Sequence, residues 1–388
     1  MKKFFQLNQR KSLFLKATCF ITLLFFIATI FSGCKKDISQ ICNDLNYYKA
    51  KSKGKVIIVH KGGSIQAAVD ASNGGEIILV EGGIYKEAIT VNKPGIQIIG
   101  LSCFTIEKVI IQNPGEEDNG ILVRDAGDGF VLRNVTVRDF KENGVFIIRA
   151  DNYILSHVVT IDNGEYGLFP IFCKGGLIEY CTATGHKDTG IYVGQSDGAV
   201  MENNIVFANV NGLEIENCSN VKATNNKAYD NVCGILVVLL PGLTIKTSSD
   251  IVVNNNKVYG NNHINFAKEE GGFEAFVPSG SGILVVGVDN VMVKNNDIKD
   301  NNFVGVATVS SLLLGAIAGL PPEAFADIEP KVDGAKITNN ILTHNGAAPP
   351  VGLPLPGVDL LWDGAGINNC WSGNQFSNSY PSPLPVCN

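Results

Sequence analysis

The sequence predicts an all-β solenoid, and two regular features of the 388-residue chain lead to this prediction. A Gly followed by Ile, Leu or Val recurs at steps of 22 to 24 residues, with one step of 48, and a short alternating strand follows each one. Later in the repeat, a second strand ends in a polar pair that contains Asn. The glycines are Gly120, Gly144, Gly167, Gly190, Gly212, Gly234, Gly282 and Gly305, and the asparagines are Asn204, Asn226, Asn256, Asn296 and Asn340.

A repeat of this length accommodates three short strands and their turns. It is too short for helical repeats of roughly 33 to 47 residues, and it lacks the pattern of leucine-rich repeats. We therefore predict a single-stranded right-handed parallel β-helix over residues 56–348. Equivalent residues of successive coils would stack about 4.8 Å apart, so that Asn at one turn position forms a hydrogen-bonded ladder. Inward residues such as Ile191, Leu213 and Ile235 would fill the core.

Both ends of the solenoid are expected to be covered. Ser64 is a favourable N-cap, and the apolar pattern of residues 64–70 predicts a short helix that caps the first coil. Residues 349–388, rich in Pro and Gly, are predicted to form a C-terminal cap in a coil conformation. Cys370 and Cys387 flank this segment and are the pair best placed for a disulfide. The cysteines inside the repeats are expected to be buried thiols: Cys173, Cys181, Cys218 and Cys233.

The first 34 residues have the features of an export signal. Basic residues are followed by an almost wholly apolar stretch, residues 17–31, and then by Phe31-Ser32-Gly33-Cys34. A Cys directly after Ser-Gly resembles a bacterial lipobox. We therefore predict a lipoprotein signal peptide over residues 1–33, lipidation of Cys34 and a polar tether over residues 34–55. The alternative is a retained N-terminal anchor helix. Either arrangement places the body of the protein outside the cytoplasm. For the lipoprotein we expect the cell envelope, at the outer membrane or the cell surface.

Several sequence stretches resemble known β-helix proteins. GGSIQAAVDAS, EIILVEGGIYKEAITV and IQIIG, followed by Asn- and Gly-rich coils, resemble the pectin-lyase-like superfamily. More narrowly, GEYGLFP, DTGIYVGQS, NGLEIEN and CGILVVLLPGL resemble an exported bacterial parallel β-helix-repeat lipoprotein family without a settled activity. The resemblance covers residues 57–345 and implies the fold. The catalytic motifs of polygalacturonases and alginate epimerases are absent, and His186-Lys187-Asp188 is not equivalent to the epimerase Asp-Pro-His. No catalytic residue is therefore transferred from those families.

Three insertions interrupt the regular spacing in the C-terminal half, at residues 239–249, 263–279 and 309–331. The distance from Gly to Asn is 14 residues in a regular coil, as from Gly212 to Asn226. Insertions on one face of a solenoid often build its binding face, so we predict a groove over the outward side of the Gly strands; tolerated variation in loop length is the alternative. Within the third insertion, residues 311–325 are expected to form a short helix packed on the solenoid, the alternatives being a docking element or a membrane contact.

The middle coils carry the candidate chemistry. Two residues before the Gly, carboxylates stack in consecutive coils at Glu142, Glu165 and Asp188. Stacked carboxylates raise one another's pKa or attract a cation, and they suit a glycosidase pair or a Ca²⁺ site. Two residues after the Gly, aromatic side chains are expected to form a strip on which sugar rings could lie. These aromatic residues are Phe146, Phe169 and Tyr192.

The predicted site combines these rows. Glu165, Asp188, His186 and Tyr192 are the predicted catalytic residues, with His186 or Tyr192 as proton-transfer groups. Further side chains are predicted to line the substrate: Phe146, Phe169, Gln195, Glu214 and Glu216. The structural alternative is that the acidic residues are solvated or bond to neighbouring turn amides.

The function predicted from the sequence is that of an exported, membrane-anchored lipoprotein that engages a polysaccharide along an outward groove. Lyase, epimerase and hydrolase activities all remain open, and Ca²⁺ is the one candidate cofactor. The alternative is a non-catalytic cell-envelope scaffold that binds a partner protein through the inserted loops. The net charge of −6, with no Lys/Arg-rich run, excludes nucleic acid as the partner.

Overall fold

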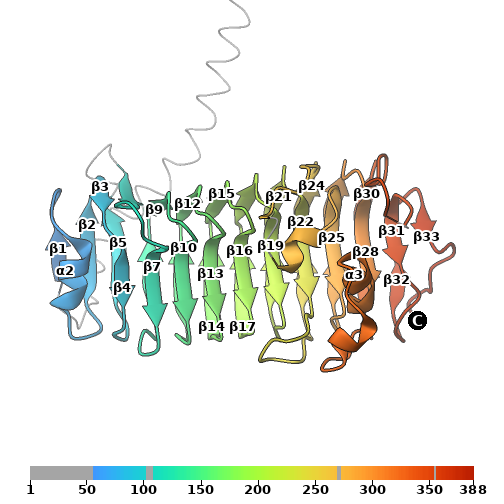
Figure 1. Cartoon of the computed structure of the whole chain (residues 1–388), viewed down its shortest axis with the longest axis horizontal. Coiled ribbons are helices and arrows are strands. Elements are labelled where there is room, and N and C mark those ends of the chain that lie inside the picture. Colours follow the sequence, from blue (N-terminus) through green and yellow to red (C-terminus); the bar gives the residue numbers. More distant parts are fainter. Residues whose placement is uncertain (1–55, 102–107, 269–271, 354) are drawn as a thin grey trace, which may run out of the picture.

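The computed structural model describes residues 56–101, 108–268, 272–353 and 355–388, and these form one elongated solenoid of parallel strands (Figure 1). Each regular coil contributes one strand to sheet A, one to sheet B and one to sheet C, in that order along the chain. Every strand pairs in parallel with its equivalents in neighbouring coils. The predicted all-β parallel β-helix is confirmed.

The strands are distributed over the three sheets as follows. In the described part of the chain, sheet A contains β1 (Val56–Val59), β2 (Ile77–Glu81), β5 (Gln97–Leu101), β8 (Val131–Arg133), β11 (Tyr153–Ser156), β14 (Lys174–Glu179), β17 (Asp197–Glu202), β20 (Lys222–Thr224), β23 (Val252–Asn254), β26 (Met292–Lys294), β29 (Lys336–Thr338) and β32 (Cys370–Ser372). Sheet B contains β3 (Gly83–Lys86), β6 (Val109–Gln112), β9 (Val135–Arg138), β12 (Val159–Ile161), β15 (Thr182–Thr184), β18 (Ile205–Phe207), β21 (Lys227–Tyr229), β24 (Lys257–Tyr259), β27 (Asp297–Lys299) and β30 (Ile341–Thr343). Sheet C contains β4 (Ile89–Val91), β7 (Asn119–Arg124), β10 (Asn143–Ile148), β13 (Tyr166–Ile171), β16 (Thr189–Gly194), β19 (Asn211–Glu216), β22 (Cys233–Val238), β25 (Ser281–Val286), β28 (Val304–Val309), β31 (Val358–Trp362) and β33 (Ser379–Tyr380).

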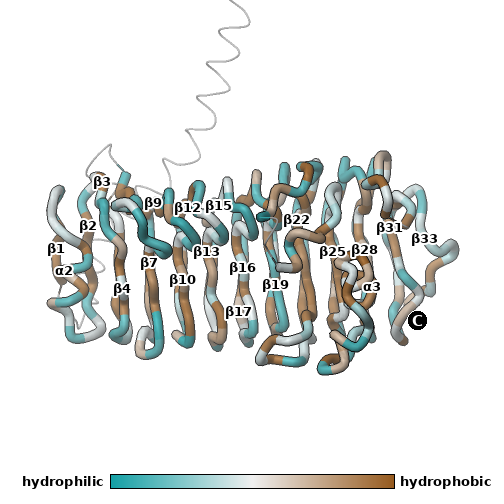
Figure 2. The backbone as a smooth tube through the Cα atoms, viewed as in Figure 1, coloured by the Kyte–Doolittle hydropathy of each residue, from teal (hydrophilic) through white to brown (hydrophobic). Residues whose placement is uncertain are grey.

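The core is a continuous apolar column inside the three sheets. Ile191, Leu213 and Ile235 occupy one register position on consecutive strands of sheet C, and each is fully buried, as predicted. Figure 2 shows hydrophobic residues along many of the strands and hydrophilic residues at many turns. Stacking identical positions places each apolar side chain on its equivalent in the next coil, so the column excludes water over its length.

The predicted Asn ladder is present at the turn between sheets A and B. Each ladder Asn accepts hydrogen bonds from the amide of the preceding one; Asn226 N, for example, donates to Asn256 Oδ1 over 2.8 Å. The first residue of each polar pair, such as Asn255 with φ 56°, turns the chain through the left-handed region, which Asn tolerates. The ladder runs through Asn204, Asn226, Asn256, Asn296, Asn340 and Asn374.

A second ladder, which the sequence did not reveal, lies at the turn between sheets B and C. Its residues are also buried, and each amide nitrogen donates to the side-chain oxygen of the next coil; Asn231 Nδ2 donates to Asn261 Oδ1 over 2.9 Å. The two ladders satisfy buried polar groups at two corners of the solenoid. The second ladder runs through Asn209, Asn231, Asn261, Asn301 and Asn345 and ends on Asp359.

The recurrent Gly exists because successive coils approach closely at the start of each sheet C strand. A Cβ added to Gly212 would lie 2.5 Å from Gly234 O and 2.9 Å from Val206 Cγ2. A Cβ added to Gly167 or to Gly282 would likewise lie 2.4 Å from the carbonyl oxygen of the equivalent Gly in the next coil. The repeat found in the sequence is therefore a steric requirement of coil stacking.

We predict that Gly212→Ala lowers the free energy of unfolding by about 1–3 kcal/mol, because the added methyl group overpacks the interior. Urea unfolding followed by circular dichroism would measure the change. Gly115→Ala is the matched control, since nothing lies within 4 Å of its added Cβ. Equal stability of Gly212→Ala and the control would contradict the steric explanation.

The N-terminal cap is as predicted. Helix α2 (Ile65–Asp70) covers the first coil and contacts β1, β2 and β4. The Ser64 hydroxyl accepts from Ala67 N over 3.1 Å, which satisfies one free amide at the start of the helix. Residues 1–55, with the predicted signal peptide, tether and lipidation site Cys34, lie outside the described residues. In the described part of the chain no helix is long and apolar enough to cross a membrane.

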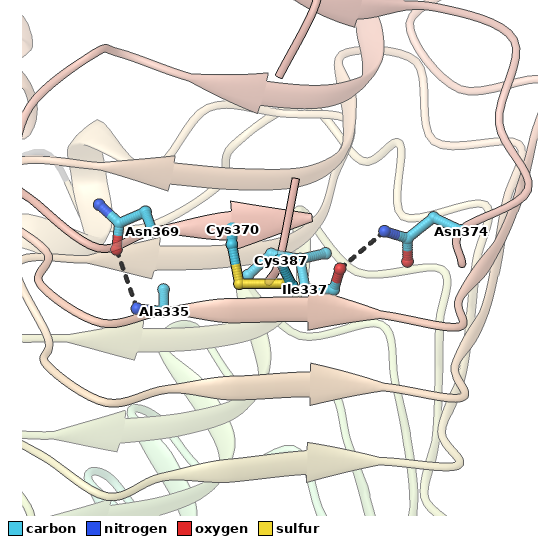
Figure 3. The surroundings of a disulfide bond; sticks show 6 residues. All are labelled: Ala335, Ile337, Asn369, Cys370, Asn374 and Cys387. Atoms are coloured by element: carbon cyan, nitrogen blue, oxygen red, sulfur yellow. Dashed lines mark hydrogen bonds between the residues drawn. A yellow bond between two sulfur atoms is a disulfide. The ribbon is translucent and has the colours of Figure 1, made fainter. Parts of the chain in front are cut away.

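The C-terminal segment corrects the predicted domain boundary at residue 348. The solenoid continues beyond it, because β31 and β33 extend sheet C and β32 extends sheet A. The predicted disulfide between Cys370 and Cys387 is present (Figure 3). Beside it, Asn369 Oδ1 accepts from Ala335 N, so the hydrogen-bonding pattern of the coils extends into the cap. Strands of the solenoid thus continue into the predicted cap, although most residues of the segment lie outside strands.

The three insertions occur where the spacing predicted them, between β22 and β23, between β24 and β25, and between β28 and β29. They contain η1 (Phe273–Phe276), α3 (Ser311–Ile317) and η2 (Pro322–Phe325). Instead of flanking an open groove, they fold onto the outward face of sheet C, where Val277, Leu314 and other apolar residues form a second buried cluster with Leu236 and Leu284. Figure 1 shows α3 in front of the sheet C strands. The predicted packing of the short helix is confirmed.

Candidate functional site

The outward face of sheet C changes character along the solenoid. In one register row, the aromatic residues Phe146 and Phe169 precede Tyr192 and Glu214, and apolar Leu236 follows. Phe146 and Phe169 are half-buried, whereas Leu236 is covered by the insertions. The candidate site lies at this boundary, where the open aromatic part of the face meets the covered apolar part.

The aromatic strip predicted from the sequence is present and includes one more ring. The Phe146 and Phe169 rings stack with their centroids 4.8 Å apart. Tyr192 meets Phe169 edge-on at 4.8 Å, and Tyr166 stacks on Phe169 at 4.3 Å. Tyr192 bends over Gly194, where an added Cβ would lie 2.0 Å from the tyrosine hydroxyl. The rings form a partly exposed apolar platform that leads to the acidic residues.

Four carboxyl groups, named here the acidic cluster, line a cavity of about 40 Å³ beside this platform. Asp188, Glu214 and Glu216 come from the solenoid, and Glu274 comes from the second insertion. Tyr192 donates a 2.6 Å hydrogen bond to Glu216, and Asn211 Nδ2 donates to Glu214 over 3.1 Å. The cavity has room for a water molecule or a substrate hydroxyl group.

Thr189 connects two members of the cluster through one hydroxyl group. Its Oγ1 lies 2.9 Å from Asp188 Oδ1 and also contacts Glu214 Oε2 at hydrogen-bonding distance. A hydroxyl carries one proton, so it cannot donate a linear hydrogen bond to both carboxylates. The geometry is satisfied when one carboxyl is protonated and donates to Thr189, which in turn donates to the other. Asp188 and Glu214 therefore form a pair that shares a proton.

Burial and mutual repulsion raise the pKa of these acids. Burial, followed by the charge of Glu274, raises the pKa of Asp188 to about 8. Burial and the charges of Asp188 and Glu216 raise the pKa of Glu214 well above its usual range. Burial raises the pKa of Glu216 to about 7, although the hydrogen bond from Tyr192 opposes this. A carboxyl that stays protonated near neutral pH can act as a general acid.

These pKa values predict a pH-dependent stability. Between the ordinary carboxyl pKa and the raised values, the native state binds more protons than the unfolded state, so the free energy of unfolding falls as pH rises. Burial lowers the pKa of His186 from 6.5 to about 4, so this residue makes the free energy of unfolding rise with pH, but only between those two values. As the pH is raised from about 7 to about 8, we expect the urea concentration at the unfolding midpoint to decrease. The decrease should be smaller in Glu214→Gln. Glu202→Gln on sheet A, the control, should keep the wild-type slope; identical slopes in all three proteins would contradict the shared-proton pair.

The structure does not support the predicted Ca²⁺ site at Glu142, Glu165 and Asp188. These residues do follow one another in consecutive coils. However, Lys268 of the second insertion donates a 2.6 Å hydrogen bond to Glu165, so an ammonium group already neutralises that carboxylate, and Asp188 is directed to Thr189. Among the described residues no group of three or more His, Cys, Asp or Glu side chains could hold a metal ion.

Two predicted site residues lie elsewhere. His186 is fully buried inside the solenoid, where its ring contacts Asn163 O at 3.2 Å and Thr160 Oγ1 at 3.1 Å; it takes the place of Asn in the second ladder. Gln195 lies at the opposite end of β16 and accepts from the amides of Thr244 and Ile245, which anchors the first insertion. The assignment of both residues to the outward groove is wrong.

The comparisons with known proteins identify the fold. A family model described as "Right handed beta helix region" matches residues 94–241. The fold is a right-handed parallel β-helix, as the sequence resemblance implied. No curated protein matches the chain in sequence.

Three solved structures show how far the likeness extends. The A-module of the mannuronan C-5 epimerase AlgE6 of Azotobacter vinelandii is 16% identical with a TM-score of 0.60, over 81% of this chain and 92% of that one. The AlgE4 A-module of the same organism is 20% identical with a TM-score of 0.55, over 82% and 93%. A periplasmic alginate epimerase, AlgG, is 12% identical with a TM-score of 0.52, over 82% and 77%. At sequence identities of 12–20%, these likenesses show a shared fold and nothing more.

Proposed function

We propose that this protein binds a polysaccharide along the aromatic platform and cleaves its glycosidic bonds at the acidic cluster. The observation that carries the proposal is that the buried carboxyls of Asp188 and Glu214 meet at the single Thr189 hydroxyl group. Burial and the neighbouring carboxylates raise the pKa of both acids, which favours a protonated carboxyl near neutral pH. The exposed parts of Phe146 and Phe169 provide apolar surface for sugar rings next to that proton donor.

The reaction that suits these groups is acid-assisted hydrolysis. The protonated carboxyl of the Asp188–Glu214 pair donates its proton to the glycosidic oxygen as the bond to the anomeric carbon breaks. A second carboxylate of the cluster, Glu216 or Glu274, accepts a proton from the water whose oxygen bonds to that carbon. Elimination or epimerisation at a uronate would need a cation to neutralise the sugar carboxylate, and no Lys or Arg lines the cavity in the described part of the chain.

The cellular setting is also a proposal. We infer that the chain is exported and anchored to the membrane by a lipid on Cys34. The disulfide between Cys370 and Cys387 supports this inference, because disulfides persist in oxidising compartments. Incorporation of radiolabelled palmitate that persists in Cys34→Ser would contradict lipidation at this position.

A polysaccharide panel tests the proposed reaction. The full-length protein in detergent micelles would be incubated with neutral and uronic polysaccharides, and the products read by mass spectrometry and proton NMR. Fragments that have gained water support hydrolysis. Unsaturated fragments would show a lyase, and an unchanged mass with altered sugar signals would show an epimerase; either result overturns hydrolysis while keeping the polysaccharide.

A partner-binding scaffold is the second candidate, favoured by one observation. An apolar hollow is lined by Phe276, Leu313 and Ile317 of the insertions and by Val351 of the C-terminal segment, among others. Phe276 and Val351 are exposed. A panel without any turnover by the folded protein would favour this candidate over catalysis.

A further inference from the structure

Sheet B carries a second set of aromatic and basic residues that the acidic cluster does not involve. Phe207, Tyr229 and Tyr259 occupy the same register position on three consecutive strands, β18, β21 and β24. Their ring centroids are 5.2 Å apart in both steps, and neighbouring ring planes differ by 9° and 4°. All three rings are half-buried. The three rings therefore form one continuous, partly exposed stack.

Lysines run beside this aromatic row. Lys227 and Lys257 are register partners on consecutive strands, and both are exposed. Lys227 Nζ lies 5.6 Å from the centre of the Tyr229 ring, and Lys299 Nζ lies 5.9 Å from that of Tyr259. None of the three lysines makes an ion pair within the described residues; Asp297 follows Lys257 in the row without a salt bridge to it.

This arrangement is unfavourable for the isolated protein. Lys227 and Lys257 occupy paired positions on neighbouring strands, whose backbones lie about 4.8 Å apart. Like charges at paired positions destabilise a sheet. The chain as a whole is acidic, with a net charge of −6, so a local group of unpaired lysines differs from the rest of the protein. An external anion with charges repeated along a line would relieve the repulsion.

We propose that the outward face of sheet B, over β18, β21, β24 and β27, binds an anionic polysaccharide. Sheet B extends along the solenoid as a row of parallel strands, and a repeated surface of this kind suits a linear polymer rather than a small ion. The ammonium groups of Lys227, Lys257 and Lys299 pair with carboxylate or sulfate groups, and the Tyr229 and Tyr259 hydroxyl groups bond to sugar hydroxyls. This surface goes beyond the proposed cleavage site, since it lies on a different sheet and requires no residue of the acidic cluster.

Binding to polygalacturonate, with neutral dextran as a comparison, tests the proposal. Full-length protein in detergent micelles would be measured by biolayer interferometry on immobilised polymer. We expect binding to polygalacturonate that weakens as salt is added, because exposed charges are screened. The Lys227→Gln/Lys257→Gln double variant is expected to raise the dissociation constant about tenfold. Tyr259→Phe, which retains the ring stack, is expected to raise it about twofold through loss of one hydroxyl group.

The matched control is Lys222→Gln/Lys336→Gln, which removes two exposed lysines from one register row of sheet A and changes the net charge equally. Equal loss of binding in the two double variants would overturn the proposal, as would absence of binding by the wild type. Double-stranded DNA bound as tightly as polygalacturonate, and lost in the same variant, would also overturn it by showing a general polyanion surface. Cleavage is measured separately, as fragment formation on the polysaccharide panel, so failure of the cleavage proposal can be distinguished from failure of this binding proposal.

Discussion

Glu214→Gln is expected to lower polysaccharide cleavage by about 100- to 10,000-fold, the range over which a general acid usually contributes. Gln has the shape of a protonated Glu and can still accept the hydrogen bonds from Thr189 and Asn211, so the fold is retained. It cannot exchange a proton with Asp188. Initial rates of fragment formation on whichever polysaccharide the protein cleaves would measure the loss.

Two further variants define what the loss means. Asp188→Asn should show a loss of similar size, and the double variant little more than either one, because the two acids act as a unit. Glu202→Gln, the same change on sheet A, should leave the rate unchanged. Wild-type activity in both Glu214→Gln and Asp188→Asn would place the chemistry outside the acidic cluster and refute the proposed site.

Asn256→Ala is expected to destabilise the fold by roughly 3–5 kcal/mol, the largest stability effect we predict, because several buried groups lose their partners together. Asn226 N and Nδ2 would lose their shared acceptor, at 2.8 and 3.0 Å, and the Ala223 carbonyl would lose its donor. Urea unfolding followed by circular dichroism would measure the change.

Asn255→Gly is the control for this variant. Asn255 is the neighbouring turn residue, exposed and in the left-handed region with φ 56°, which Gly adopts without strain. We expect its stability to stay within about 0.5 kcal/mol of the wild type. A similar small effect of Asn256→Ala would mean that water replaces the ladder and that the stack contributes little to stability.

The repeat, the first ladder and the aromatic strip could be predicted because each depends on one residue type at a fixed spacing. The second ladder could not be found in the same way. Its asparagines follow different residues, such as Ala208, Asp230 and Gly260, so no constant pair marks them. The buried position of His186 could not be predicted either. Gly185, with φ 81°, turns the chain just before His186, so the alternation of a strand does not apply there.

The covered half of sheet C shows another limit of repeat reasoning. The spacing predicted where the insertions lie, but it did not predict that they fold over the strands. A signal was present, since the outward row changes from Tyr192 and Glu214 to Leu236 and Leu284, and a row of exposed leucines requires a cover. Glu274 could not be assigned to the acidic cluster because it lies outside the repeat, and only the tertiary fold brings it to Asp188.

The buried cysteines have a consequence for how the chain matures. Cys173, Cys181, Cys218 and Cys233 are all buried, and burial raises the pKa of Cys173 to about 11 and that of Cys181 to about 12. The thiolate is the form that oxidants and disulfides attack, so the finished solenoid keeps these sulfurs unreactive. The nascent chain has no such protection. In an oxidising compartment, coil formation and thiol oxidation therefore compete, and a coil that closes slowly risks a misplaced crosslink.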